Sequence, residues 1–203
     1  MKNILWLICL FCTIEIYGKE YHLNFNQGTP LISVDRLVQG IAGQSLDLSE
    51  TAYNRYGIEI ASIDSTDVSH SFSVFLWVKS SANYLGSKAL VTNKKTLEIN
   101  DKGFFIGTQD NGSWMVSFCD GIHNAWEYKP TKERQPIDDG RWHQIGITHD
   151  ADKQEMRMYY DGKNVAIYCT NGNVNLATNN IFRLGCFNDS QWHSFNGQID
   201  EFL

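Results

Sequence analysis

The chain has 203 residues and a formal net charge of −6. This acidic balance argues against DNA or RNA as a partner, because binding to phosphates requires a basic face. No apolar run reaches the about 20 residues that a membrane-spanning helix requires, so no membrane span is predicted.

Residues 1–18, MKNILWLICLFCTIEIYG, have the layout of a secretory signal peptide. One early lysine is followed by an apolar run and then by Gly18, the predicted cleavage point. Cys9 and Cys12 form a C-x-x-C inside the apolar run, and we interpret them as leader residues that are removed. The protein is therefore predicted to be secreted, periplasmic or displayed on the cell surface, with one domain over residues 19–203.

Short segments with a period of two follow one another along the mature chain. In FSVFLWVK (72–79), Phe72, Val74, Leu76 and Val78 share one face, and the segments SWMVSFC (113–119), EMRMYY (155–160) and IFRLGCF (181–187) alternate in the same way. Asn-Gly or Asp-Gly pairs, which suit tight turns, occur at 111–112, 120–121, 139–140, 161–162, 171–172 and 196–197. Short strands separated by frequent turns predict an all-β sandwich or barrel.

The last segment, FNGQIDEFL (195–203), begins like a strand and stops at Leu203. We expect the domain to be truncated in this strand, so that the chain is a fragment or the leading domain of a longer protein.

The segment DDGRWHQIGITHD (138–150) resembles an active site at first sight. On a strand, however, His143 shares the face of two isoleucines and lies roughly 20 Å from His149 at about 3.3 Å per residue, too far to share a metal ion. We interpret His143 as a half-buried structural residue that is hydrogen-bonded to backbone, and we assign His149 no function.

Catalytic acids do not stand out. Sandwich glucanases place two carboxyl groups about 5–5.5 Å apart for a retaining reaction, whereas the acids of EIASID (59–64) and IDE (199–201) fall on opposite faces of an extended chain. No nucleophile elbow, P-loop or dinucleotide fingerprint is present in the sequence. Whether the chain is an enzyme stays open, with the balance against activity inside it; a sandwich glycosidase with an unfamiliar acid pair is the remaining catalytic alternative.

Aromatic residues near turn signals suggest a binding role. Trp126, Tyr128 and Trp192 lie in polar, loop-like stretches, and flat rings beside amides suit sugars. The alternative is that these rings cover the ends of the sandwich.

One structural calcium ion is the only cofactor considered. Asn26 and Asp200 could supply oxygens to it if the first and last strands lie side by side. The alternative is that both are ordinary polar residues.

The mature chain keeps three cysteines, an odd number. We favour a Cys169–Cys186 disulfide, with no disulfide at all as the alternative.

Four segments in this order resemble laminin G-like domains of the concanavalin A-like lectin/glucanase superfamily. They are LVQGIAGQSLDLS (37–49), FSVFLWVKS (72–80), DDGRWHQIGITHDADKQEMRMYYDGKNVAIY (138–168) and FRLGCFNDSQWHSFNGQIDEF (182–202). The resemblance implies a jelly-roll β-sandwich of two antiparallel sheets, often with one calcium ion. It also implies structural roles for Trp142, His143, Asp161, Gly162 and Gly197.

The same resemblance implies a non-catalytic binding module for a glycan or an extracellular protein. Such domains also precede secreted hydrolases, including phosphoesterases, sulfatases and glycosidases. GTQDNGSW (107–114) and the segment 120–140 look most like modules fused to phosphoesterases, in which case a catalytic part would lie beyond Leu203.

Overall fold

Two antiparallel sheets make up almost all of the regular structure in the computed structural model, which describes residues 22, 25, 37–49, 57–60, 63–80, 86–187 and 195–203. The seven-stranded sheet runs in the order β1 (Leu37–Gln39), β2 (Gln44–Asp47), β13 (Gln198–Asp200), β4 (Phe72–Lys79), β9 (His143–Asp150), β10 (Glu155–Tyr160) and β11 (Lys163–Cys169). The six-stranded sheet runs in the order β3 (Ile58–Ile60), β12 (Phe182–Leu184), β5 (Ala89–Thr92), β6 (Gly103–Thr108), β7 (Trp114–Cys119) and β8 (Ala125–Tyr128). A 3₁₀ helix, η3 (Ser65–Val68), precedes β4.

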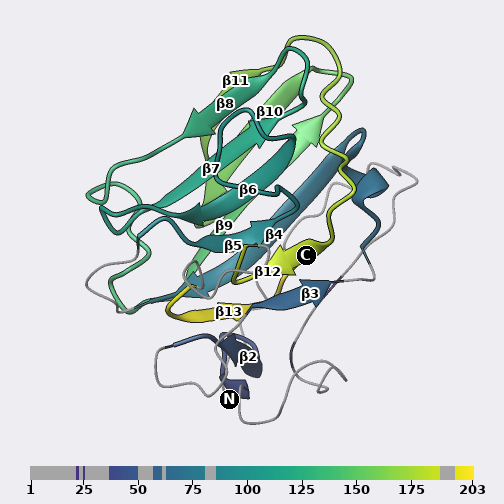
Figure 1. The fold of residues 1–203 in the computed structure, drawn as a ribbon. Helices are drawn as coiled ribbons and strands as arrows, with labels where there is room; N and C mark the ends of the chain where they lie inside the picture. The colour runs from purple at the N-terminus through teal and green to yellow at the C-terminus, as the bar shows by residue number, and fades with distance from the viewer. Residues whose placement is uncertain are drawn as a thin grey trace, which may run out of the picture.

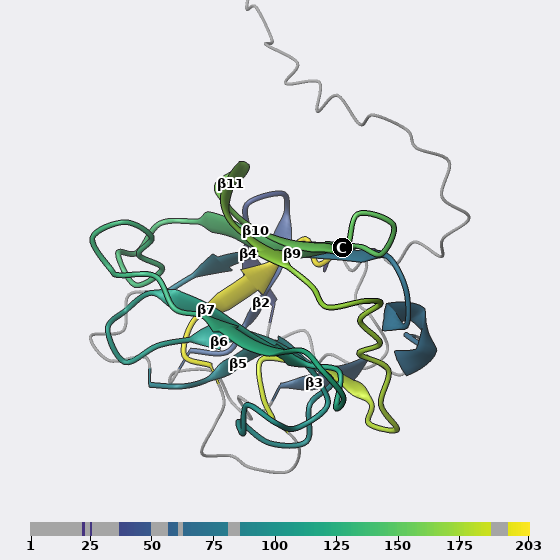
Figure 2. The same cartoon turned by 90° about the horizontal axis from the view of Figure 1, so that it is seen from above.

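The sheets lie face to face as two layers, which Figure 2 shows from above and Figure 1 from the side. Many neighbouring strands are far apart in the sequence; β13, for example, is inserted between β2 and β4. This crossed order confirms the jelly-roll sandwich predicted for the chain. Among the described residues, no helix is long and apolar enough to span a membrane.

The core lies between the two sheets and follows the alternation of the sequence. On β4, Val74, Leu76 and Val78 are buried. Across the pair β4–β9 they face Ile147, Ile145 and His143, in register. Burying one face of each strand is the main favourable contribution to folding, and it also sets the register, since a slip by one residue would expose the whole apolar set.

Most of the predicted Asn-Gly and Asp-Gly turns require glycine for its backbone conformation. Gly112, Gly121, Gly140, Gly162 and Gly172 all have positive φ. The sixth pair differs.

At Gly197 the requirement is space rather than φ. A Cβ atom there would lie 2.4 Å from the Lys79 carbonyl oxygen and 2.6 Å from the Phe195 ring. Gly197 therefore allows β13 to pack closely beside β4.

Candidate functional site

His143 connects the start of β9 to the turn between β10 and β11. Its Nδ1 lies 3.0 Å from Asp161 Oδ2 and 2.8 Å from the Tyr160 hydroxyl, and its Nε2 lies 3.2 Å from Asp139 Oδ1. The ring is thus bound to side chains and not to backbone, because Asp161 and Gly162 form a two-residue turn of positive φ that brings the Asp161 carboxylate back over the strand entry. Burial raises the pKa of Tyr160. These contacts connect the start of β9 to the turn that contains Asp139 and to the β10–β11 hairpin, so His143 has a structural role.

Trp142 lies just before β9 and is half-buried. The Lys79 ammonium group lies 5.8 Å from the centre of its ring, within the range of a cation–π interaction. Trp142 thereby covers the end of β4.

Trp126 and Tyr128 lie on strand β8, where the sequence suggested a loop. The Trp126 ring stacks on Tyr168 of the opposite sheet with a centroid distance of 4.8 Å. The Tyr128 hydroxyl accepts a hydrogen bond of 2.8 Å from Gln135 Nε2. Both rings are half-buried and pack on the core at the β8–β11 side of the sandwich. The third predicted binding residue, Trp192, lies outside the described residues.

Asp200 lies on β13, beside β2. Its Oδ2 accepts hydrogen bonds from the backbone of Ile41 at 2.9 Å and Ala42 at 3.3 Å, and its Oδ1 accepts one from the Glu201 backbone at 2.8 Å. Burial raises the pKa of this carboxyl group. Amide donors contact both oxygens, so Asp200 anchors the β1–β2 turn. The other predicted ligand, Asn26, lies outside the described residues.

No group of three or more His, Cys, Asp or Glu side chains gathers in a way that could hold a metal ion within the described part of the chain.

The predicted Cys169–Cys186 disulfide does not form in the structure. Cys119, Cys169 and Cys186 are all free thiols. Cys169 ends β11, the edge strand of the seven-stranded sheet, whereas Cys186 follows β12 near the β3 edge of the other sheet. The topology thus separates two cysteines that the sequence brings within 17 positions of each other. Burial raises the pKa of the Cys186 thiol.

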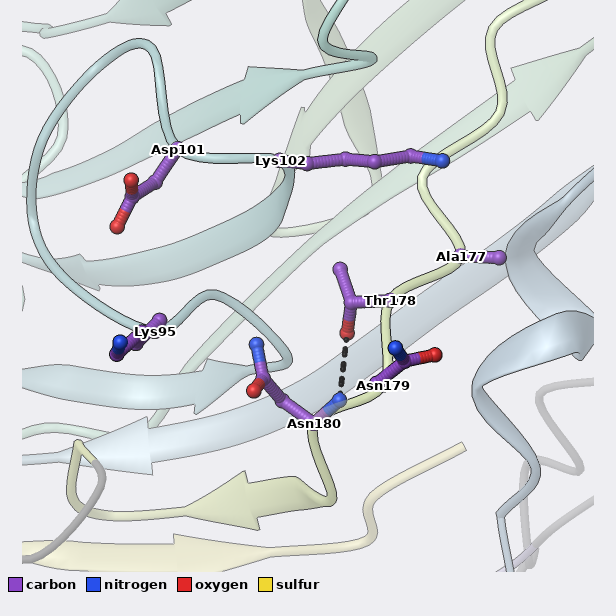
Figure 3. A pocket seen from close by; sticks show the side chains of 7 residues that line it. All are labelled: Lys95, Asp101, Lys102, Ala177, Thr178, Asn179 and Asn180. Carbon is purple, nitrogen blue, oxygen red and sulfur yellow. Dashed lines mark hydrogen bonds between the residues drawn. The ribbon is translucent and has the colours of Figure 1, made fainter.

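Two loops at one end of the sandwich enclose an open pocket of about 350 Å³, which we call the loop pocket (Figure 3). One loop, residues 93–102, connects β5 to β6, and the other, residues 170–181, connects β11 to β12. The lining residues are Lys95, Asp101, Lys102, Ala177, Thr178, Asn179 and Asn180.

Asn93 fastens the two loops to each other. Its buried side chain donates to the Leu176 carbonyl oxygen at 2.9 Å and accepts from the Phe104 N–H at 2.8 Å. Its backbone carbonyl oxygen accepts hydrogen bonds from Thr178 Oγ1 at 3.0 Å and Asn180 Nδ2 at 3.1 Å. Asn93 does not itself line the pocket, but three of these hydrogen bonds, to Leu176, Thr178 and Asn180, join the two loops that do.

Two further residues beside Asn93 support loop 93–102. Gly103 has a φ of +117°, and a Cβ atom on it would lie 2.5 Å from Asn93 Oδ1. Lys94 is buried, and its Nζ donates to Ser117 Oγ at 3.1 Å. Burial lowers the pKa of Lys94. The first residues of loop 93–102 are therefore held by buried polar contacts.

Some of the side chains that line the loop pocket are accessible to a ligand. Lys95, Lys102 and Asn179 are exposed. In Figure 3, Lys102 extends toward the segment that carries Ala177, Thr178, Asn179 and Asn180. The wall therefore offers ammonium, amide, hydroxyl and carboxylate groups together, an arrangement that can hydrogen-bond a polyhydroxylated molecule.

Sequence reasoning did not single out any of these lining residues. The signal available was weak: TNKK (92–95) and ATNN (177–180) are polar runs that interrupt the alternating pattern. Since they lie more than 80 positions apart, only the fold brings them together.

The fold and pocket define a sandwich of the lectin type, and comparison with known families agrees. A family model described as the concanavalin A-like lectin/glucanases superfamily, Laminin_G_3, matches residues 54–203. The chain belongs to this family. A comparison with curated protein sequences found no match.

Solved structures share the fold at low sequence identity. A carbohydrate-binding module, CBM40, of the Ruminococcus gnavus IT-sialidase bound to α2,3-sialyllactose is 11% identical, with a TM-score of 0.58 over 78% of this chain and 87% of that one. Domain 4 of AbnA, a GH43 extracellular arabinanase from Geobacillus stearothermophilus, in complex with arabinotriose, is 18% identical, with a TM-score of 0.56 over 90% and 79%. Domains LG4-5 of the mouse laminin α1 chain are 19% identical, with a TM-score of 0.56 over 87% and 45%.

Proposed function

We propose that this chain is a secreted, non-catalytic module that binds a glycan in the loop pocket. The observation that supports the proposal is the set of exposed polar side chains, Lys95, Lys102 and Asn179, that line a pocket between two loops joined by Asn93. A preformed wall lowers the entropic cost of binding a flexible sugar. The sialyllactose and arabinotriose complexes of the structural neighbours support glycan as the ligand class.

A glycan array followed by titration calorimetry tests the proposal. Asn179→Ala should weaken binding about tenfold, the effect of removing a hydrogen bond worth about 1.4 kcal/mol. Asn179 is exposed and its side chain forms no hydrogen bond with another described residue, so the substitution should leave folding unaffected. Asn173→Ala, on the same loop but outside the pocket, is the matched control and should bind like the wild type.

The β8–β11 side of the sandwich, with Trp126 and Tyr128, is the alternative binding place. Trp126→Leu keeps an apolar contact for Tyr168 but removes the large ring. Loss of binding in this variant, together with normal binding in Asn179→Ala, would move the site to that side.

The chain also fits the role of a leading domain in a larger secreted hydrolase. Two structural neighbours are themselves domains of hydrolases, a sialidase and an arabinanase. Mass spectrometry of the natural protein tests both parts: secretion predicts a first residue of Lys19, and fusion predicts peptides that continue beyond Leu203. A natural product with Met1 retained and Leu203 last would reject both.

A further inference from the structure

We infer that the loop pocket recognises the acidic group of a sugar, a carboxylate or a sulfate or phosphate ester, through the ammonium groups of Lys95 and Lys102. This inference rests on the proposed function, since it names the class of glycan bound at the same site.

The charge of the pocket is opposite to the charge of the chain. The protein as a whole carries −6. The wall of the loop pocket carries two ammonium groups and one carboxylate, that of Asp101. An acidic ligand approaching an acidic protein would be attracted at this place, because nearby charges dominate over those beyond the screening length of about 8–10 Å.

The ammonium groups of the two lysines form no ion pair within the described part of the chain. Neither Lys95 nor Lys102 has a carboxylate within 4.0 Å in the described part of the chain. In contrast, Lys129, Lys132 and Lys153 are each paired with an aspartate or glutamate.

The single acid in the wall is already engaged. Asp101 Oδ2 accepts a hydrogen bond from the Thr96 hydroxyl, a contact within its own loop. The contact fixes the position of the carboxylate but leaves its negative charge, so the two ammonium groups and this one carboxylate give the wall a net positive charge.

The placement of the lysines suits an anion on a sugar ring better than a free ion. They lie near opposite ends of the loop 93–102, across from Asn179 and Asn180 of the other loop. The two ammonium groups lie on different sides of the pocket (Figure 3), so an acidic group bound by either of them would leave the ring hydroxyls within reach of the amides. Charge-assisted hydrogen bonds are about twice as strong as neutral ones, so the acidic group would dominate the affinity.

The experiment compares paired ligands on the whole chain. Sialyllactose is compared with lactose, oligogalacturonate with neutral galacto-oligosaccharides, and a sulfated oligosaccharide with its desulfated form. Sodium sulfate and sodium acetate are included as free anions. Each ligand is titrated at about 20 mM and about 300 mM salt, since exposed charges are screened at the higher concentration.

The test variant is Lys95→Ala/Lys102→Ala. The control is Arg134→Ala/Lys163→Ala, which removes the same charge from two exposed cations that do not line the pocket. Circular dichroism and the thermal midpoint show that both variants are folded.

We expect at least one acidic ligand to bind about tenfold or more tightly than its neutral partner and to weaken at high salt. The test variant should lose this preference about tenfold or more, and the control should keep it. Equal binding of an acidic ligand and its neutral partner would overturn the inference and leave glycan binding standing.

Other results are equally decisive. Loss of preference in the control variant as well would show a general charge effect and overturn the assignment to Lys95 and Lys102. Free anions that bind as tightly as the acidic sugars would show a simple ion site. Absence of binding to every glycan, acidic or neutral, would overturn the proposed function itself.

Discussion

Two histidines on the same strand and the same face differ in what surrounds them. His143, at the start of β9, contacts two carboxylates and a phenol. His149, at the far end, donates Nδ1–H to the His70 carbonyl oxygen at 2.6 Å, and its Nε2 has no hydrogen-bond partner in the described chain. Burial lowers the pKa of His149. The two histidines therefore have different surroundings at the two ends of the strand.

His149 should make the protein less stable in mild acid. Its pKa in the folded state lies below the value of about 6.5 for the unfolded chain, so the unfolded chain binds the proton first. The stability is full above about pH 6.5 and falls as the pH drops toward the folded pKa. His149→Asn keeps a donor for His70 but cannot be protonated, so we expect a lower stability at pH 8 and a flatter pH dependence. Urea unfolding at pH 8.0 and pH 5.5 measures both.

The control for this measurement is His123→Asn, because His123 is exposed. It should keep the pH dependence of the wild type. An equal loss of stability between the two pH values in wild type and His149→Asn would contradict the assignment to His149.

The three cysteines in the described part of the chain should react in two classes. Cys169 is exposed, whereas Cys119 is 4% and Cys186 is 6% exposed. A thiol reagent should modify Cys169 in the native protein, and the other two only after unfolding, since burial also holds back the reactive thiolate. Cys169→Ser should abolish the fast reaction. A protein with no reactive thiol until a reductant is added would instead support a disulfide.

Among the elements, loops 93–102 and 170–181 hold each other in position. Loop 170–181 buries Val174 and Leu176 in the core, and loop 93–102 begins at Asn93, which binds both loops. The loop pocket is thus formed by connections whose apolar and polar anchors lie inside the sandwich. This explains how a surface pocket can be preformed although loops are usually the more mobile parts of a protein.

Asn93→Ala should separate the two loops. It leaves the Phe104 N–H and the Leu176 carbonyl group buried without side-chain partners, which should lower the free energy of unfolding by roughly 2 kcal/mol or more. Chemical denaturation measures the loss, and ligand binding should weaken in parallel. Asn173→Ala is the control, with an expected change within about 0.5 kcal/mol for an exposed residue. A fully stable Asn93→Ala variant would show that the loops are held in another way.

For the whole molecule, one question is whether a metal ion contributes to the sandwich. The calcium hypothesis requires Asn26 beside Asp200, but Asn26 lies outside the described residues; β13, which carries Asp200, lies beside β2. Yet the Asp200 oxygens accept three backbone N–H groups and hold the turn that follows β1. Hydrogen bonds from Ile41 and Ala42 to Asp200 therefore join β13 to this turn.

We expect a calcium chelator to leave the thermal midpoint unchanged. The measurement compares unfolding in excess calcium and in excess chelator, with magnesium as a control for ionic strength. Asp200→Ala should lower the midpoint equally in both solutions, because the hydrogen bonds to the turn are lost. A midpoint that falls with the chelator only in the wild type would establish a calcium site that includes Asp200.

The β-sandwich fold could be predicted from the sequence. Its alternating segments predicted β4, β7, β10 and β12, and its Asp-Gly and Asn-Gly pairs predicted the turns, because side-chain period and backbone φ are local properties. The segment around Trp142 and His143 also indicated the family, which the match over residues 54–203 confirms.

Which distant residues become neighbours could be learned only from the tertiary structure. The order of strands in the two sheets brings Trp126 into contact with Tyr168 and separates Cys169 from Cys186. It also places Lys102 and Asn180 around the same pocket. That order is set by burial of the two inner faces against each other, a long-range requirement that the spacing of residues in one segment does not contain.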